Sequence, residues 1–310
     1  MRKRWLETLN RLAVEDERIV FIGSDLTADA GMKKFHEDIG PRFFMEGVSE
    51  MHIVGMAAGM AMCGRIPYVN TIATFLTRRC YEQNMIDVGH ANVKVRLIGG
   101  GGGLVYAPLG PTHLATEDIA IMRSIPNMTV VAPCDADEME RAIEASVDWP
   151  GPIYFRVAKG GEATVSRKDL GFEIGKAIVH RAGGDVLLID TGTMLQTALA
   201  AADQLAKQGI SCGVIHAHTV KPFDRDAVIG AIRGARVVLT LEEHAVNGGL
   251  GGLVAELVAE TRMPRTVAFK RIGLPDAFMD EYGSQDSLKA KFGLDAGGIA
   301  ASAVRLLADA

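Results

Sequence analysis

The sequence predicts an α/β protein of two doubly wound domains: a first domain with a parallel sheet, and a smaller second α/β domain. Short apolar runs of strand length alternate with segments of helical period, and the connections between them are short. The alternation stops in a polar stretch and then restarts. With 310 residues, 48% of them hydrophobic, the chain can build two cores. We therefore assign residues 1–160 to the first domain, 161–182 to a linker and 183–310 to the second domain.

The elements of the first domain follow from the spacing of its apolar residues. Residues 5–13 carry apolar side chains at helical spacing, and residues 19–25 form an apolar run that ends in polar residues, as a buried parallel strand does. After a short extended segment at 42–49, the pattern predicts a helix at 50–63, a strand at 66–72, a helix at 77–91, a strand at 93–100, a helix at 117–125, a strand at 128–133, a helix at 136–148 and a strand at 152–158.

The second domain repeats the same alternation after the linker. Its predicted elements are a strand at 185–192, a helix at 194–209, a strand at 211–219, a helix at 225–234, a strand at 235–244 and a helix at 251–261.

Composition excludes several functional classes. The 33 basic and 38 acidic residues give a net charge of −5, which argues against nucleic acid or an anionic membrane as the main partner. The longest apolar run, 53–63, is shorter than the roughly 18–20 residues that a membrane helix needs. The N-terminus has no apolar signal-peptide core, and the four cysteines form no CxxC pair. We therefore expect a reduced, cytoplasmic protein.

Two features lie where open α/β sheets bind ligands. The run Gly99–Gly103 follows a predicted strand but does not fit GxGxxG, so it is either a flexible strand exit or a glycine-walled substrate channel. His113 follows among turn-forming residues. It is either a solvated loop residue or an acid–base group at the sheet edge.

Five other side chains have both a structural and a functional interpretation. Glu50 begins a helix, where it either complements the helix dipole or, if buried, bonds a cationic or protonated group. Phe75 and Tyr81 follow a strand, and they either belong to the core or stack on a flat heterocycle. His216 and His218 alternate along a strand but lack a third metal ligand in the sequence, so we predict a structural role and no metal site.

Several motifs together resemble the transketolase family. Residues 47–83, 110–138 and 151–160, which include the motifs GPTH and YFRVAKG, resemble its pyrimidine-binding domain. The second half is similar to its C-terminal domain, in DVLLIDTGTMLQTALAAADQLAKQGI at 185–210, in HTVKPFD at 218–224 and in LTLEEHAVNGGLGG at 239–252.

The resemblance also implies a missing part. Full-length transketolases carry an N-terminal domain whose GDG motif and a later Asn bind the diphosphate of thiamine diphosphate through a metal, whereas the Gly184–Asp185 pair here continues into a strand. The resemblance therefore implies the C-terminal subunit of a split transketolase, which transfers a two-carbon ketol unit between sugar (phosphate) substrates. It implies an N-terminal partner subunit that holds the diphosphate with Mg²⁺ (or Ca²⁺). It also implies self-association as a dimer within an α2β2 assembly.

Family roles can be carried over to matching residues. Glu50 is expected to contact N1′ of the aminopyrimidine, and Phe75 and Tyr81 to flank that ring. Leu26 is expected to be the apolar prop under the bent cofactor. His113 is expected to assist proton movement when a ketose donor is cleaved.

The substrate residues depart from the family pattern. The family's Asp before the GPTH-type His is Leu109 here, its phosphate-contacting His is Gly101, and its Ser near the first strand aligns about at Asp29. Arg156 matches the family's phosphate-binding Arg. We therefore expect a donor or acceptor other than the standard pentose phosphate pair.

Three alternatives share much of this pattern: the β subunit of a 2-oxoacid dehydrogenase, a deoxyxylulose-phosphate synthase-like enzyme, and a non-catalytic transketolase-like subunit. The segment 110–128 favours transketolase over the first two. The presence of Glu50, Phe75 and His113 argues against the third.

Overall fold

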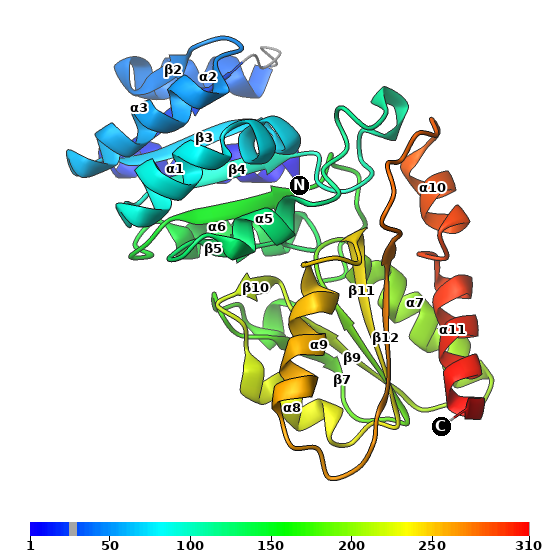
Figure 1. The fold of residues 1–310 in the computed structure, drawn as a ribbon. Coiled ribbons are helices and arrows are strands. Elements are labelled where there is room, and N and C mark those ends of the chain that lie inside the picture. Colours follow the sequence, from blue (N-terminus) through cyan, green and yellow to red (C-terminus); the bar gives the residue numbers. More distant parts are fainter. Residues whose placement is uncertain (25–29, 310) are drawn as a thin grey trace.

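The computed structural model describes residues 1–24 and 30–309, which form two α/β units, the first drawn above the second in Figure 1. Each unit has its own sheet with helices on both faces. The predicted fold class is thus confirmed, with one antiparallel strand at an edge of each sheet.

The first sheet has seven strands in the order β10-β5-β6-β4-β3-β1-β2. All neighbours are parallel except β10 and β5. The strands are β1 (Ile19–Gly23), β2 (Phe43–Met45), β3 (Ile66–Ile72), β4 (Arg96–Gly100), β5 (Thr129–Val131), β6 (Ile153–Val157) and β10 (Thr219–Lys221). The helices of this unit are α1 (Arg2–Glu15), α2 (Ala30–Ile39), α3 (Glu50–Met62), α4 (Tyr81–Gln83), α5 (Asp118–Ser124) and α6 (Ala136–Ser146).

A separate apolar core covers each face of this sheet. One contains Trp5, Leu9 and Phe35 from α1 and α2, together with Met139 and Ile143 from α6. The other core lies under α3 and α5 and includes Ile53, Val54 and Ile119. Because both faces are covered, β1 and β6 are buried along their whole length rather than at alternate residues.

The second sheet has five strands in the order β12-β11-β8-β9-β7. They are β7 (Ile178–Arg181), β8 (Val186–Asp190), β9 (Cys212–His216), β11 (Val237–Ala245) and β12 (Ala268–Leu274). The helices are α7 (Met194–Lys207), α8 (Arg225–Ile232), α9 (Leu250–Glu260), α10 (Gln285–Lys291) and α11 (Ala296–Asp309).

The structure differs from the predicted elements in several places. Residues 178–181, predicted as linker, form β7 at the edge of the second sheet. The segment 211–219 is divided between the two sheets, because β9 ends at His216 and β10 pairs with β5 of the first unit. The predicted helix at 77–91 is largely π-helical, with turns η2 (Phe75–Arg79) and η3 (Asn84–His90) on either side of α4.

The two units are joined by contacts other than the chain connection. The backbone N–H of Ala245, at the end of β11, donates to the carbonyl of Thr116 in the loop after β4, at 2.7 Å. Arg156 of β6 donates to the carbonyl of Glu243 in β11, at 2.7 Å. The second unit therefore packs against the carboxyl-end loops of the first, where open α/β sheets bind ligands.

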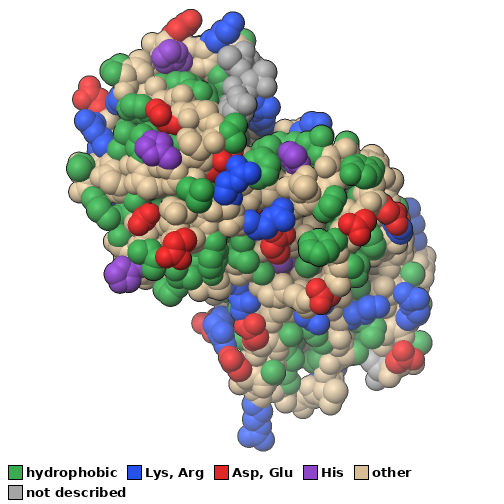
Figure 2. Space-filling view, turned by 45° about the horizontal axis from the view of Figure 1, so that its top comes forward, with side chains coloured by type: hydrophobic (Ala, Val, Ile, Leu, Met, Phe, Trp, Pro, Cys, Tyr) green, Lys and Arg blue, Asp and Glu red, His purple; other side chains and the backbone are tan. Residues whose placement is uncertain are grey.

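The surface carries charges of both signs. On the face shown in Figure 2, basic and acidic side chains are interspersed rather than gathered into one patch. Among the described residues, no helix is long and apolar enough to cross a membrane.

Candidate active site

The buried carboxylate of Glu50 is paired with one cation. Glu50 is the first residue of α3 and its side chain is 3% exposed, while Oε2 accepts a hydrogen bond from Nη1 of Arg79 at 2.5 Å. A buried carboxylate is costly unless a partner compensates its charge. Arg79, whose side chain is 39% exposed, supplies this compensation from the π-helical turn η2.

Aromatic rings extend the cluster from Arg79 to His113. The guanidinium carbon of Arg79 lies 4.4 Å from the centre of the Phe75 ring, a cation–π contact. The Phe75 ring in turn meets the His113 imidazole edge-on, with centres 5.2 Å apart, and Tyr106 lies 6.4 Å from the same imidazole. The structure thus brings three predicted site residues, Glu50, Phe75 and His113, into one contiguous cluster.

The topology explains why these residues meet. Glu50 follows β2, Phe75 follows β3, and His113 lies in the loop after β4, and these parallel strands all end at the same edge of the sheet. Thr112 fixes the His113 side chain through a 2.9 Å contact between its Oγ1 and Nδ1 of the imidazole. Residues that are far apart in the chain therefore share one edge, as in other open α/β sheets.

Other predicted cofactor residues lie elsewhere. The Tyr81 hydroxyl contacts Ser124 Oγ of α5 at 2.8 Å, and its ring packs against the core below α3 and α5. This placement joins Tyr81 to the helix layer, and its role at the cofactor ring stays a prediction. Leu26 and Asp29 lie outside the described residues.

The glycine run is needed for close packing. A Cβ on Gly101, whose φ is +80°, would lie 2.0 Å from Cε2 of Tyr106. A Cβ on Gly102 would lie 2.5 Å from Cγ of Arg156, and one on Gly103 would lie 2.4 Å from Oε1 of Glu243. These buried glycines allow the strand exit to pass between larger side chains, and the space that a side chain at position 101 needs is taken by Tyr106.

Arg156 lies in the interior, with 7% of its side chain exposed. Its Nε donates to Asp118 Oδ2 at 3.0 Å, and its Nη2 donates to the carbonyls of Ala115 and Glu243. Burial opposes its charge, but the Asp118 and Glu243 carboxylates outweigh this effect and raise the pKa of Arg156. These contacts give Arg156 a structural role between the two units, and its role in phosphate binding stays a prediction.

Asp118 also holds Tyr154, whose hydroxyl donates to Oδ2 at 2.7 Å. Burial, together with the neighbouring Asp118 carboxylate, raises the pKa of Tyr154 well above its ordinary value. The phenol therefore remains a neutral donor at physiological pH.

The surface of the described residues includes a smaller hollow near the His113 loop and a larger one elsewhere. The smaller hollow, of about 460 Å³, lies between Arg78, Pro111 and Leu114 on one side and residues 275–279 on the other. Leu109, the predicted substrate position, is 50% exposed in the same loop.

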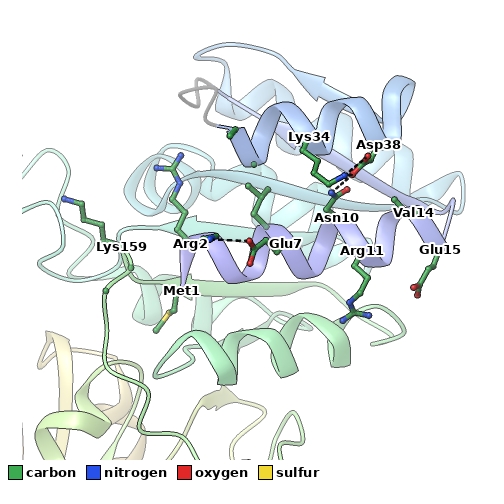
Figure 3. A pocket seen from close by; sticks show the side chains of 16 residues that line it. Met1, Arg2, Glu7, Asn10, Arg11, Val14, Glu15, Lys34, Asp38 and Lys159 are labelled. Carbon is green, nitrogen blue, oxygen red and sulfur yellow. Dashed lines mark hydrogen bonds and ion pairs between the residues drawn. The ribbon is translucent and has the colours of Figure 1, made fainter.

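A larger hollow of about 1030 Å³ runs along α1 (Figure 3). Asn10, Lys34 and Asp38 are linked by hydrogen bonds on its wall. The lining residues do not include Glu50, Phe75 or His113. The larger hollow is thus separate from the candidate site.

Comparison with protein families assigns a known domain to each of the two units. Residues 1–161 match the transketolase pyrimidine binding domain, and residues 175–299 match the transketolase C-terminal domain. The chain belongs to the transketolase family. The two family domains correspond to the two sheets of the structure, except that β10, which lies in the second matched segment, belongs to the first sheet.

Transketolase relatives with separate subunits match over nearly their full length. The chain is 37% identical over 296 residues to the 6-deoxy-6-sulfo-D-fructose transketolase subunit SqwH of a Clostridium species, covering 96% of this chain and 91% of that one. A solved structure described as a split gene transketolase, an inactive beta4 tetramer, has a TM-score of 0.89 and 31% identity, covering 99% and 98% of the two chains. The predicted likeness to a split-transketolase subunit is confirmed.

A synthase relative matches over a smaller share of its length. The chain is 38% identical over 297 residues to 1-deoxy-D-xylulose-5-phosphate synthase of Syntrophotalea carbinolica, covering 95% of this chain but 46% of the synthase.

Sequence reasoning missed two residues of the cluster. Arg79 pairs with Glu50 and covers Phe75, and Tyr106 fills the space beside Gly101 and contacts His113. The dipeptide Arg78–Arg79, next to a segment that is otherwise largely apolar, was the available signal for the first. Nothing in the local sequence distinguishes Tyr106 from an ordinary core aromatic.

Proposed function

We propose that this chain is the C-terminal subunit of a two-chain, thiamine diphosphate-dependent transketolase that transfers a two-carbon ketol unit between sugar (phosphate) substrates. The observation that carries the proposal is the buried Glu50 carboxylate, which Arg79 links to the Phe75 ring, with His113 at the edge of that ring.

The residues of the cluster fit the aminopyrimidine ring of the cofactor. Arg79 occupies the position that we assign to the aminopyrimidine ring. Its flat guanidinium lies over Phe75 and donates an N–H to Glu50. A flat heterocycle that shares a proton with Glu50 would use the same two contacts. Arg79 would then move from the ring face while remaining within reach of Glu50.

The cofactor, when bound, supplies the electron sink for breaking a carbon–carbon bond. Glu50 would hold a proton at the pyrimidine N1′, in a site where burial strengthens that hydrogen bond. Phe75 would orient the ring by stacking, and His113 would move a proton at the substrate. The partner subunit would hold the diphosphate with Mg²⁺ (or Ca²⁺).

The test is cofactor-dependent turnover by the assembled complex. Replacing Glu50 with Gln keeps the size of the side chain but removes its ability to hold the proton as a carboxylate. We expect kcat to fall by about 10²–10⁴-fold, which is the usual rate contribution of a positioned acid–base group. Ketol transfer is measured with the partner subunit, thiamine diphosphate and Mg²⁺.

The matched control is Glu46→Gln, an exposed carboxylate four residues earlier, which should leave kcat unchanged. Near-normal turnover by the Glu50 variant would refute the role at N1′. A wild-type complex that uses pyruvate as donor instead of a ketose would support the synthase or 2-oxoacid alternative. A complex with no turnover at all would support a non-catalytic subunit.

The substrate is a ketose or aldose outside the standard pentose phosphate pair. Leu109 cannot accept a hydrogen bond from a donor hydroxyl, and the space beside Gly101 is filled by Tyr106. The relative named for 6-deoxy-6-sulfo-D-fructose supports an anionic ketose of another kind. The same assay run over a panel of ketoses should therefore show weak turnover of xylulose 5-phosphate with ribose 5-phosphate, and robust turnover of that pair would contradict this proposal.

The subunit also associates with a second copy of itself. Five exposed apolar side chains lie on and around β2, α3 and η3, the elements next to Glu50: Met45, Val48, Met51, Met62 and Ile86. The similarity to a split gene transketolase described as a tetramer supports self-association. We propose a dimer through this apolar face, flanked by two partner subunits as α2β2.

A further inference from the structure

A group of buried polar side chains lies where the two units meet. Cys134 follows β5, and Glu138 lies in the first turn of α6, both in the first unit. From the second unit, Asp190 ends β8 and His216 ends β9. We call these four residues the junction cluster; none of its side chains is more than 2% exposed. Although His216 lacks a third metal ligand in the sequence, the fold supplies further donors from the other unit.

The ring of His216 is held from both sides. Its Nδ1 lies 2.6 Å from Asp190 Oδ1, and its Nε2 lies 3.0 Å from Glu138 Oε2. A carboxylate on one ring nitrogen fixes the orientation of an imidazole and leaves the other nitrogen to bind a metal, as in carboxylate–histidine–zinc arrangements. Here Asp190 would orient the ring, and Nε2, which lies beside Glu138 of the first unit, would be the nitrogen that binds the metal together with that carboxylate.

Three potential ligand atoms converge at that point. Cys134 Sγ, a carboxylate oxygen of Glu138 and a ring nitrogen of His216 all lie within 4.8 Å of one another. Four ligands at Zn²⁺–ligand distances of about 2.0–2.3 Å lie roughly 3–4 Å apart, so small side-chain shifts would complete the geometry. Thiolate, imidazole and carboxylate together suit Zn²⁺ better than Mg²⁺ or Ca²⁺, which prefer oxygen ligands alone.

Several buried polar atoms in this region have no hydrogen-bond partner. Within the described chain these are Glu138 Oε1, Asp190 Oδ2, His180 Nε2 and His218 Nε2, together with the three guanidinium nitrogens of Arg141, whose charge acts on His218. The rings of His180 and His218 lie 6.2 and 6.0 Å from that of His216. Buried polar atoms without partners are rare, and two of these, Glu138 Oε1 and His218 Nε2, are atoms that can bind a cation.

We propose that Cys134, Glu138 and His216 bind a structural Zn²⁺ that joins the two domains, with Asp190 orienting His216. His218 offers a fourth donor, since its Nδ1 is engaged by Thr219 Oγ1 at 2.9 Å and its Nε2 is unpartnered. A turn of this side chain toward the ion, or a water molecule, completes four-coordination. The zinc site is independent of the cofactor cluster around Glu50.

The experiment measures metal in the full chain. The protein is expressed in zinc-supplemented medium, dialysed, and analysed by plasma mass spectrometry. We expect about one Zn²⁺ per wild-type chain, and loss of most of it in Cys134→Ser and in His216→Asn, each of which removes one ligand. Cys212→Ser, a partly buried thiol on the same strand as His216, is the matched control and should retain the metal.

Cobalt substitution gives a second measurement that does not need the variants to fold. Co²⁺ bound through Cys134 should show a thiolate charge-transfer band and tetrahedral visible absorption, both abolished by added Zn²⁺. A folded wild-type chain with no bound zinc and no cobalt spectrum would overturn the proposal and leave His216 as a protonated link between two carboxylates. Equal zinc in wild type and in a folded Cys134→Ser variant would also overturn it, because the metal would then lie elsewhere.

Discussion

At the scale of single residues, the Glu50–Arg79 pair shows how a buried carboxylate is compensated by a cation that solvent still reaches. The carboxylate is almost fully buried while its cation is more than a third exposed. The pair can therefore be opened from the solvent side without unfolding α3. Glu50, Phe75 and His113 could be predicted from motifs, but the pairing with Arg79 could not, because it depends on how η2 turns after β3.

A double-mutant cycle tests the strength of this pair. We expect Arg79→Met to lower the free energy of unfolding of the isolated chain by about 1–3 kcal/mol, since it leaves a buried carboxylate uncompensated while solvent still reaches the site. Adding Glu50→Gln should recover part of this loss. The measurement is urea unfolding of the two single variants and the double variant. Additive effects would show that the two side chains do not stabilise each other.

At the scale of elements, the π-helical turns determine where Phe75 and Arg79 lie. A helix-period pattern correctly predicted helical structure at 77–91 but could not reveal its wider π turns, because the extra residue per turn leaves no local signature. Asn84, buried in η3, donates through Nδ2 to the carbonyl of Leu76 at 2.8 Å. This bond ties η3 back to η2.

Replacing Asn84 with Leu removes that bond and leaves the Leu76 carbonyl unpaired. We expect a loss of about 1–3 kcal/mol in the free energy of unfolding, the usual cost of an unsatisfied buried polar group. In the assembled complex we also expect a higher KM for thiamine diphosphate, because Phe75 would shift. Thermal or urea unfolding measures the first effect, and a cofactor titration the second. The exposed neighbour Glu82→Ala serves as a control that should change neither.

At the scale of the whole molecule, alternation of strands and helices predicted two sheets but not how the chain connects them. The segment 211–219 is predicted as one strand, yet the chain leaves the second sheet after His216 and then adds β10 to the first. The pairing of β10 with β5 depends on β5 having an open edge in the first sheet, and no local sequence pattern encodes that edge. The strand β12 and the helices α10 and α11 were also absent from the sequence prediction.

The apolar face around α3 gives a prediction about assembly. We expect Met62→Lys, which places a charge where a side chain is 64% exposed, to weaken self-association by at least about tenfold, because an unpaired charge would be desolvated in the interface. Light scattering over a concentration series measures the shift. Val14→Lys, on α1 and 56% exposed, should leave the mass unchanged. An equal effect of both substitutions would place the contact elsewhere.

The close approach of Tyr106 to Gly101 restricts how this subunit could be converted to another substrate. A histidine at position 101 would meet the phenol ring at once and would also have to adopt a left-handed backbone. Reintroducing that imidazole alone should therefore damage folding before it alters selectivity. A redesign should therefore replace Tyr106 with a smaller residue before it replaces Gly101. In the opposite order, the single variant at Gly101 is expected not to fold.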